Sequence, residues 1–403
     1  MGSAILNSSM FELRTCDLIV TFKSLKTKTM LRFIATTILS AILLIAVISI
    51  ITESLYGGGA EFPDKTNTPT LAGESLEVVA NLDYPPGNIA VSDTGRVFFT
   101  FHPEARPPFN IAELIDGKAV QVSLNDDINL HSVLSMRIDR QNRLWLLDYA
   151  DHGSATPQIL AIDLDTMNVV HHHEFSADIA KLGSHLNDFQ VNQDGSKIYI
   201  ANASILGLSP SIIIYDTQSQ TSRQLLLDHA SVEPDFYTPN VEGEKMLMFG
   251  VFAIRPGVDS IALDRNGEWL YFAPVTDEHL HRIRTRDLNN LSLTHEQLGK
   301  KVERFGEKTM SDGITTDNAG NIYLSDMEHS AIVRIKPDRT LETLIKDPKL
   351  RWPDGFSFGL NGWLYVTSSA LQEVIAKTDT HIAKHGPYQI FRVKTDSTAA
   401  AGH

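Results

Sequence analysis

The sequence predicts an all-β protein, a six-bladed β-propeller preceded by one apolar N-terminal helix that is either a transmembrane anchor or a secretion signal. Two observations carry this prediction: one strand–turn–strand pattern recurs six times between residues 86 and 368, and one long apolar run occupies residues 31–51. The composition is that of a globular protein, 42% hydrophobic and 21% charged with a single Cys. It excludes a disordered, collagenous or disulfide-stapled chain.

The apolar run at residues 31–51 contains one charge, Arg32, and as a helix it can span the ~30 Å hydrocarbon core of a bilayer. Basic residues precede the run and Glu53 follows it, so the positive-inside rule predicts a cytoplasmic tail at 1–30 and the bulk of the chain outside, periplasmic or secreted. Met30 is an alternative start, which would make residues 1–29 artefactual. Small residues at 58–60 suit signal peptidase, but the apolar core exceeds the usual ~7–15 residues. Anchor and cleaved signal both stay open, and residues 52–73 read as a linker.

The six-fold repeat is clearest in SDGITTDNAGNIYLSD, residues 311–326, where an alternating strand, a turn ending on Gly and a second strand follow one another. Further copies occupy residues 86–101, 134–148, 186–202, 258–274 and 353–368. The turn residues are Gly95, Asn142, Gly195, Gly267, Gly320 and Gly362, and the aromatics that follow them are Phe98, Trp145, Tyr199, Tyr271, Tyr323 and Tyr365. Alternation with Asp/Asn-Gly turns is typical of β-hairpins.

The spacing between copies leaves room for about four short strands each, as in a propeller blade. The longest gap needs an insertion, which residues 223–250 supply, and residues 286–308 read as a short helix on a loop. We place the propeller at 74–394 and a short tail at 395–403. Its closure is predicted to pair strand 74–82 with strand 388–394, which leaves no exposed edge at that seam.

One aligned column of residues points to a functional site. The residues eight positions before each turn residue open the innermost strand of a blade, which lines the central channel: Gly87, Leu134, Asn187, Asp259, Asp312 and Asp354. Three carboxylates and an amide that converge need a cation or a ligand amine to neutralise them. Oxygen ligands favour Ca²⁺ or another divalent cation over zinc. Asp188, Ser135 and Asn88 are neighbouring candidates; the alternative is that the column only caps turns.

Other signals exclude several function classes. A net charge of −14 without a basic stripe excludes nucleic-acid binding. Cys16 precedes the apolar run, so the propeller has no thiol nucleophile or zinc-binding cysteine cluster. The tract at residues 171–173 (HHH) is predicted to lie on a surface strand, because alternate side chains point to opposite faces. His102, His131, His152 and His185 lie near strand ends, within reach of the channel mouth.

The segments SDGITTDNAGNIYLSDMEHSAIVRI, WPDGFSFGLNGWLYVTSSALQ and SIALDRNGEWLYFAPVTDEHLHRIRTRDL resemble the yellow/major royal jelly protein family over most of residues 74–394. That family is similar in fold to the senescence-marker/gluconolactonase propellers, whose channel metal is held by Glu, Asn and Asp. By this resemblance, Asn187 looks like the channel Asn and Asp312 like the metal-ligating Asp. Asp259 stands where the second family has an Asn, and Gly87 stands where it has the metal-ligating Glu.

The resemblance implies a secreted or membrane-anchored propeller that binds a small polar or cationic ligand through Asn187, Asp188, Asp259, Asp312 and Asp354. The alternative is a divalent-metal-dependent hydrolase of sugar lactones, with the metal on Asn187, Asp259, Asp312 and Asp354. Asp312 or Asp259 would then serve as the catalytic base. A third possibility is a structural propeller whose channel is filled.

Overall fold

The computed structural model describes residues 6–52, 54, 57–124, 128–205 and 209–399, with side chains from residue 28 onward. The ends of the predicted N- and C-terminal tails lie outside the described residues. The chain divides into two compact units, residues 1–58 with 250–252 and the remainder.

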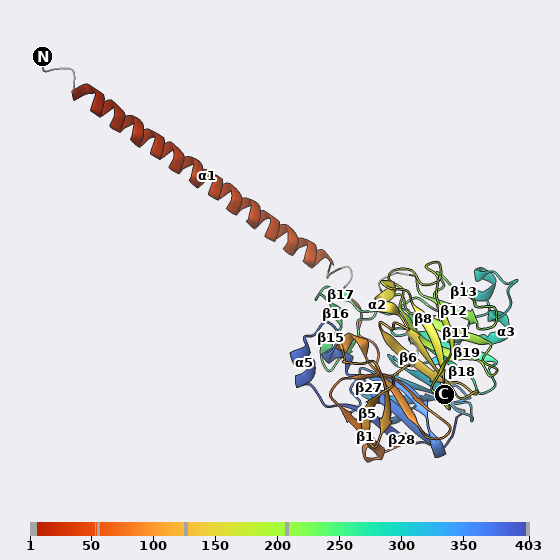
Figure 1. Cartoon of the computed structure of the whole chain (residues 1–403). Coiled ribbons are helices and arrows are strands. Elements are labelled where there is room, and N and C mark those ends of the chain that lie inside the picture. The colour runs from red at the N-terminus through yellow and green to blue at the C-terminus, as the bar shows by residue number, and fades with distance from the viewer. Residues whose placement is uncertain (1–5, 53, 55–56, 125–127, 206–208, 400–403) are drawn as a thin grey trace. The chain divides into compact units, whose positions relative to one another are not determined.

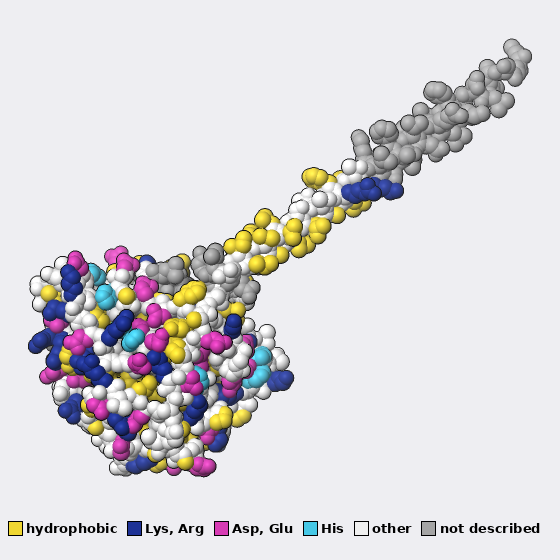
Figure 2. Space-filling view, turned by 180° about the vertical axis from the view of Figure 1, so that it is seen from behind, with side chains coloured by type: hydrophobic (Ala, Val, Ile, Leu, Met, Phe, Trp, Pro, Cys, Tyr) yellow, Lys and Arg dark blue, Asp and Glu magenta, His cyan; other side chains and the backbone are white. Residues whose placement is uncertain are grey.

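The first unit is dominated by one helix, α1 (Leu6–Thr52) (Figure 1). Within its segment Lys28–Thr52, the most apolar window of 18 residues has a mean hydropathy of 2.8, and the side chains of that window are exposed. Figure 2 shows basic side chains at the start of this segment and apolar ones along it. The segment is an apolar N-terminal helix, of the kind that serves as a secretion signal or an anchor. The helix begins well before residue 31, because residues 6–30 contain neither Pro nor Gly to end it.

The second unit is a six-bladed β-propeller of antiparallel four-stranded sheets. Blade one has β2 (Pro86–Val91), β3 (Val97–Phe101), β4 (Ile111–Ile115) and β5 (Lys118–Gln121); blade two has β6 (Val133–Ile138), β7 (Arg143–Asp148), β8 (Gln158–Asp163) and β9 (Val169–Glu174). Blade three has β10 (Leu186–Val191), β11 (Lys197–Asn202), β12 (Ser211–Asp216) and β13 (Thr221–Leu225); blade four has β18 (Val258–Leu263), β19 (Trp269–Pro274), β20 (His279–Arg284) and β21 (Glu303–Glu307). Blade five has β22 (Ile314–Thr316), β23 (Ile322–Asp326), β24 (Ala331–Ile335) and β25 (Leu341–Lys346). Blade six has β26 (Pro353–Phe358), β27 (Trp363–Ser368), β28 (Tyr388–Lys394) and β1 (Leu76–Leu82).

The first strand of each blade neighbours that of the next, and β26 returns to β2, so these strands surround the channel. The six predicted turn residues all have positive φ, from 58° at Asn142 to 87° at Gly320. This is the left-handed backbone that glycine adopts without a steric penalty. Five of the six predicted aromatics are buried in the packing between sheets, while Tyr365 is half-buried. The repeat therefore marks the inner hairpin of every blade.

The ring closes as the sequence predicted. Strand β1 pairs antiparallel with β28, with Leu82 opposite Tyr388 and Leu76 opposite Val393. Strands from both ends of the propeller thus complete one blade. Strand β28 is paired on both of its edges, by β1 and by β27. A side-chain hydrogen bond also connects blade six to blade one: the Thr367 hydroxyl donates to the Gly87 carbonyl at 2.5 Å.

The second part of the predicted linker (residues 52–73) lies along the propeller. The N–H groups of Thr70 and Leu71 donate to the carbonyls of Thr343 and Leu344 at 2.9 Å, which extends the edge of blade five. Phe62 is buried in the core. A short 3₁₀ turn, Gly73–Ser75, leads into β1.

The predicted insertion begins later and ends later than residues 223–250, because its first residues belong to β13. It contains the short strands β14 (Asn240–Val241), β15 (Glu244–Lys245), β16 (Leu247–Met248) and β17 (Phe252–Ala253). The helix predicted at 286–308 is two short helices, α3 (Thr285–Leu288) and α4 (His295–Gly299), and the last residues of that range form β21. Between other strands lie α2 (Ala150–Gly153), α5 (Asp379–Lys384) and 3₁₀ turns at Pro103–Ala105, Leu360–Gly362 and Leu371–Glu373.

Candidate functional site

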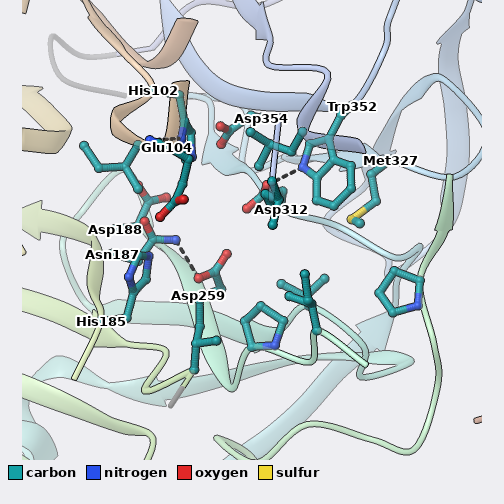
Figure 3. Close-up of a pocket in the computed structure, with 18 of the residues that line it drawn as sticks. His102, Glu104, His185, Asn187, Asp188, Asp259, Asp312, Met327, Trp352 and Asp354 are labelled. Carbon is teal, nitrogen blue, oxygen red and sulfur yellow. Dashed lines mark hydrogen bonds between the residues drawn. The ribbon is translucent and has the colours of Figure 1, made fainter. Parts of the chain in front are cut away.

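The structure brings the five predicted site residues into one pocket at the mouth of the channel (Figure 3). They come from different blades, because each opens or follows the start of an innermost strand: Asn187 and Asp188 in β10, Asp259 in β18, Asp312 just before β22, and Asp354 in β26. The pocket encloses about 950 Å³ between its lining atoms, including its opening to solvent. Leu134 and Asn88 also line it, whereas Gly87 does not.

The carboxyl groups of Asp259 and Asp312 lie next to each other in this pocket. Both residues are buried, with exposed fractions of 4% and 9%. Burial, and then the neighbouring charge of Asp312, raise the pKa of Asp259 well above its usual range. Burial also raises the pKa of Asp354, again with Asp312 as the second cause. The floor of the pocket therefore holds excess negative charge that a proton or a cation must balance.

Each of these carboxylates is held by a donor from a neighbouring element. The Asn187 amide donates to Asp259 Oδ1 at 2.5 Å, and the Trp352 indole N–H donates to Asp312 Oδ2 at 2.6 Å. The Ser369 hydroxyl donates to Asp354 Oδ2 at 2.8 Å. These bonds fix the orientation of the carboxyl groups, which point toward a common space in Figure 3.

Asp188 differs from the other carboxylates because a cation of the protein faces it. The Arg137 guanidinium lies 3.4 Å from Asp188 Oδ2, and Asn88 and Ser135 donate to Asp188 Oδ1 at 2.8 and 3.1 Å. Burial still raises the pKa of Asp188. Sequence reasoning missed Arg137. A signal was present, since Arg137 follows the inward-facing Ser135 by two positions on a strand.

A second polar group lines the pocket near its mouth. His152 Nε2 lies 3.5 Å from Glu104 Oε1, and the Nδ1 atoms of His152 and His185 lie 3.1 Å apart. Interaction with His152 lowers the pKa of Glu104 to about 2, and burial lowers that of His185 to about 3. The sequence pattern placed His152 and His185 near the channel mouth but did not pair them with each other. Glu104 carried no sequence signal.

The backbone that presents His152 is unusual. Three successive residues that are not glycine, Ala150, Asp151 and His152, have φ of 51°, 49° and 57°. Left-handed conformations cost roughly 1–2 kcal/mol for each such residue. The surrounding structure must supply that energy to hold His152 in the pocket.

Apolar side chains form the remaining wall of the pocket. Four come from the insertion between blades three and four, namely Pro239, Met248, Ile254 and Pro256. Others come from loops on the same end of the propeller, namely Val275, Met327, Leu371 and Ile375. The pocket thus combines an acidic floor with an apolar wall.

The histidine tract lies elsewhere, on the outer strand β9, as predicted. His171 Nε2 contacts the Tyr215 hydroxyl at 2.7 Å and His172 Nε2 contacts Gln158 Oε1 at 2.7 Å. His173 stacks on the Tyr215 ring. His171 and His173 therefore pack against blade three, while the contact of His172 stays within blade two.

A family model for the major royal jelly proteins matches residues 131–399, two thirds of the chain. The chain belongs to the major royal jelly protein family. A search of curated proteins found no match.

Solved structures place this family member among the six-bladed propellers. A calcium-binding protein, regucalcin, from Agrobacterium tumefaciens has a TM-score of 0.53 at 16% identity, with 81% of this chain and 95% of that chain covered. A luciferin-regenerating enzyme has a TM-score of 0.53 at 12% identity, with 81% and 97% covered. XC5397 from Xanthomonas campestris, a gluconolactonase, has a TM-score of 0.50 at 13% identity, with 79% and 88% covered. At these identities the likeness shows the fold.

Proposed function

We propose that this royal jelly family propeller binds a small organic cation in its channel, with the ammonium group at the carboxylates and an apolar portion against the opposite wall. One observation carries the proposal. The buried, neighbouring carboxyl groups of Asp259 and Asp312 line the same pocket as an apolar wall that includes Val275 and Ile254. An acidic floor recognises a positive charge, and an apolar wall recognises what the charge is attached to.

The charge balance of the floor supports a cationic ligand. Arg137 forms an ion pair with Asp188, so its positive charge already balances that carboxylate. Asp259, Asp312 and Asp354 accept hydrogen bonds only from neutral groups in the contacts described above. A ligand ammonium between Asp259 and Asp312 would balance their negative charge, and it would donate hydrogen bonds to both.

A second candidate function is the hydrolysis of sugar lactones with a divalent cation. The side chains of Asn187, Asp259, Asp312 and Asp354 supply oxygen atoms, the ligands that Ca²⁺ prefers, and all four line one pocket. A cation bound there would polarise a lactone carbonyl and acidify a water. Asp259 or Asp312 would accept the proton of that water. The fold shared with a calcium-binding regucalcin and a gluconolactonase favours testing this candidate.

Calorimetry on the full-length chain in detergent separates the two functions. We expect 2-phenylethylamine to bind, and 2-phenylethanol, which has the same ring without the ammonium, to bind at least about tenfold more weakly. Asp259→Asn and Asp312→Asn should each weaken the amine, and Asp178→Asn, an exposed carboxylate, should leave it unchanged. Equal binding of amine and alcohol would contradict the organic-cation proposal.

The same samples test the second candidate. Hydrolysis of glucono-δ-lactone that requires Ca²⁺, stops with EDTA and is lost in Asp312→Asn would favour the hydrolase. If neither the amine nor Ca²⁺ binds, the acidic column serves the fold alone.

The proposal places the propeller outside the cytoplasm, because the apolar helix follows basic residues. An alkaline phosphatase fused after residue 73 should therefore be active. An inactive fusion, together with an active cytoplasmic reporter at the same junction, would reverse the orientation.

A further inference from the structure

Two histidines and a glutamate converge near the channel wall, outside the pocket described above. His381 lies in α5, His385 ends that helix one turn later, and Glu373 ends the preceding 3₁₀ turn. His381 Nε2 lies 2.6 Å from Glu373 Oε2, and His385 Nε2 lies 3.5 Å from the same oxygen. The two imidazole rings are stacked with centroids 4.1 Å apart. All three side chains are half-buried and reach solvent.

The hydrogen bond of His385 Nδ1 determines what its other ring nitrogen, Nε2, can bind. His385 Nδ1 lies 2.8 Å from the backbone carbonyl of His381, and a carbonyl only accepts, so Nδ1 carries the proton. In the neutral ring Nε2 then bears a lone pair, and that lone pair faces the Glu373 carboxylate. Two acceptors face each other there unless a cation lies between them.

The two stacked rings, with centroids 4.1 Å apart, bring both Nε2 atoms to a single carboxylate, Glu373. A metal ion satisfies all three groups at once. The hydrogen bond from His385 Nδ1 to a carbonyl is also the one that orients a metal-ligating histidine.

We propose that Glu373, His381 and His385 bind a zinc-class divalent transition metal through Glu373 Oε2 and the two Nε2 atoms. The three ligand atoms lie within 4.8 Å of one another. Tetrahedral zinc, with ligands at about 2.0–2.1 Å, separates them by roughly 3.3 Å. The His385–Glu373 separation already matches, and His381 needs to withdraw by less than 1 Å. Water completes the coordination on the exposed side.

A second cluster of similar composition shows what a salt bridge looks like in this fold. His329 Nδ1 lies 3.0 Å from Asp326 Oδ1, and His329 Nε2 lies 3.6 Å from Asp64 Oδ2. Both ring nitrogens face carboxylates, and the hydrogen bond with Asp326 raises the pKa of His329. Unlike His385, this ring has no nitrogen bound to a backbone carbonyl in the contacts described, and it serves as a matched control.

The proposed metal would act on the channel from outside it. Glu373 follows Leu371 and precedes Ile375, which both line the apolar wall. A metal that joins this segment to α5 would hold the wall in place. Ligand affinity in the channel should therefore rise when the metal is bound.

The test uses the full-length chain in detergent, carrying no polyhistidine tag, and Zn²⁺ alone as the probe. Calorimetry should give one Zn²⁺ that His381→Gln with His385→Gln weakens at least about tenfold. His329→Gln should bind Zn²⁺ like the unmodified chain, and so should Asp259→Asn with Asp312→Asn. Cu²⁺ in the unmodified chain should give an electron paramagnetic resonance spectrum with coupling to two imidazole nitrogens.

The outcomes decide the proposal without relying on one variant. Absence of Zn²⁺ binding, or full binding in the double histidine variant, overturns it. Loss of Zn²⁺ in Asp259→Asn with Asp312→Asn places the ion in the channel and also overturns it. If the double histidine variant fails to fold, the Cu²⁺ spectrum still decides, since a spectrum without nitrogen coupling rules out these ligands.

Discussion

Replacing Asp259 with Asn should stabilise the ligand-free protein at neutral pH. Asn has the shape of Asp, its oxygen can accept from the Asn187 amide, and its nitrogen can donate to Asp312. The substitution keeps the hydrogen bond from Asn187 and removes one buried acidic group. We therefore expect a gain in the free energy of unfolding rather than the loss usual for a buried polar residue.

The expected gain in the free energy of unfolding equals the free energy by which the neighbouring Asp259 and Asp312 carboxyls destabilise the folded protein at pH 7. If Asp259 holds a proton there, the cost is at most about 4 kcal/mol, since each pH unit above the ordinary pKa of 3.8 is worth about 1.36 kcal/mol. If both groups are ionised, their repulsion at ~4 Å with an effective dielectric constant of ~20 is also about 4 kcal/mol. Local relaxation lowers both limits, so we expect a gain of roughly 1–3 kcal/mol, or a few degrees in Tm.

The pH dependence has a definite sign. Burial raises the pKa of Asp259 in the folded protein, so between the ordinary value of 3.8 and the raised one the folded state binds a proton that the unfolded state releases. Stability from this group is fully present below 3.8 and is lost as the pH rises through that window. The difference between Asp259→Asn and the unmodified chain should therefore grow with pH.

Thermal melts from pH 4 to 8 check this reasoning. Asp178→Asn, an exposed carboxylate, should melt like the unmodified chain at every pH. An Asp259→Asn protein that melts at or below the unmodified chain at pH 7 would refute the coupling between the two carboxyls. Saturating 2-phenylethylamine should reverse the order, because only the unmodified chain gains its binding energy.

Three further perturbations test the fold around the site. Thr367→Val removes the hydroxyl that donates to the Gly87 carbonyl at the ring closure and should lower the free energy of unfolding by about 1–3 kcal/mol in denaturant titrations. Gln220→Gly should raise that free energy by roughly 0.5–1 kcal/mol in the same assay, since the exposed Gln220 has φ of 54°. Burial raises the pKa of Glu328 to about 7, where it accepts from the Asn240 N–H at 2.6 Å, so stability should fall from pH 4.5 to 7. Melts of Glu328→Gln should be flatter over that range; an unchanged slope would contradict this.

The six hairpins could be predicted from local sequence because their causes are local. A glycine at a positive φ, an alternating strand and an aromatic three or four residues later all act within about 16 residues of one another. The same register predicted that Asn187, Asp259, Asp312 and Asp354 meet, since equal positions in equal blades face one axis. The β1–β28 pairing could be predicted because both strands lie outside the six hairpins and each needed a hydrogen-bonding partner.

The other side chains that surround those four residues in the pocket could not be predicted from the sequence, because tertiary structure brings them there. Arg137 reaches Asp188, and Trp352 reaches Asp312, through folding of segments 51 and 40 residues apart. No period in the sequence sets such distances. Whether a side chain faces the channel also depends on how far it extends from its strand.

The sequence by itself determined the fold class, the ring closure and the acidic column, because period-two alternation and turn chemistry specify blades one at a time. Tertiary structure decided the chemistry around that column. The Glu104–His152 pair needs a strained turn, and the apolar wall needs an insertion folded over the mouth. Both arise from packing between loops of different blades, where loop path and side-chain volume, rather than any repeated pattern, set which atoms meet.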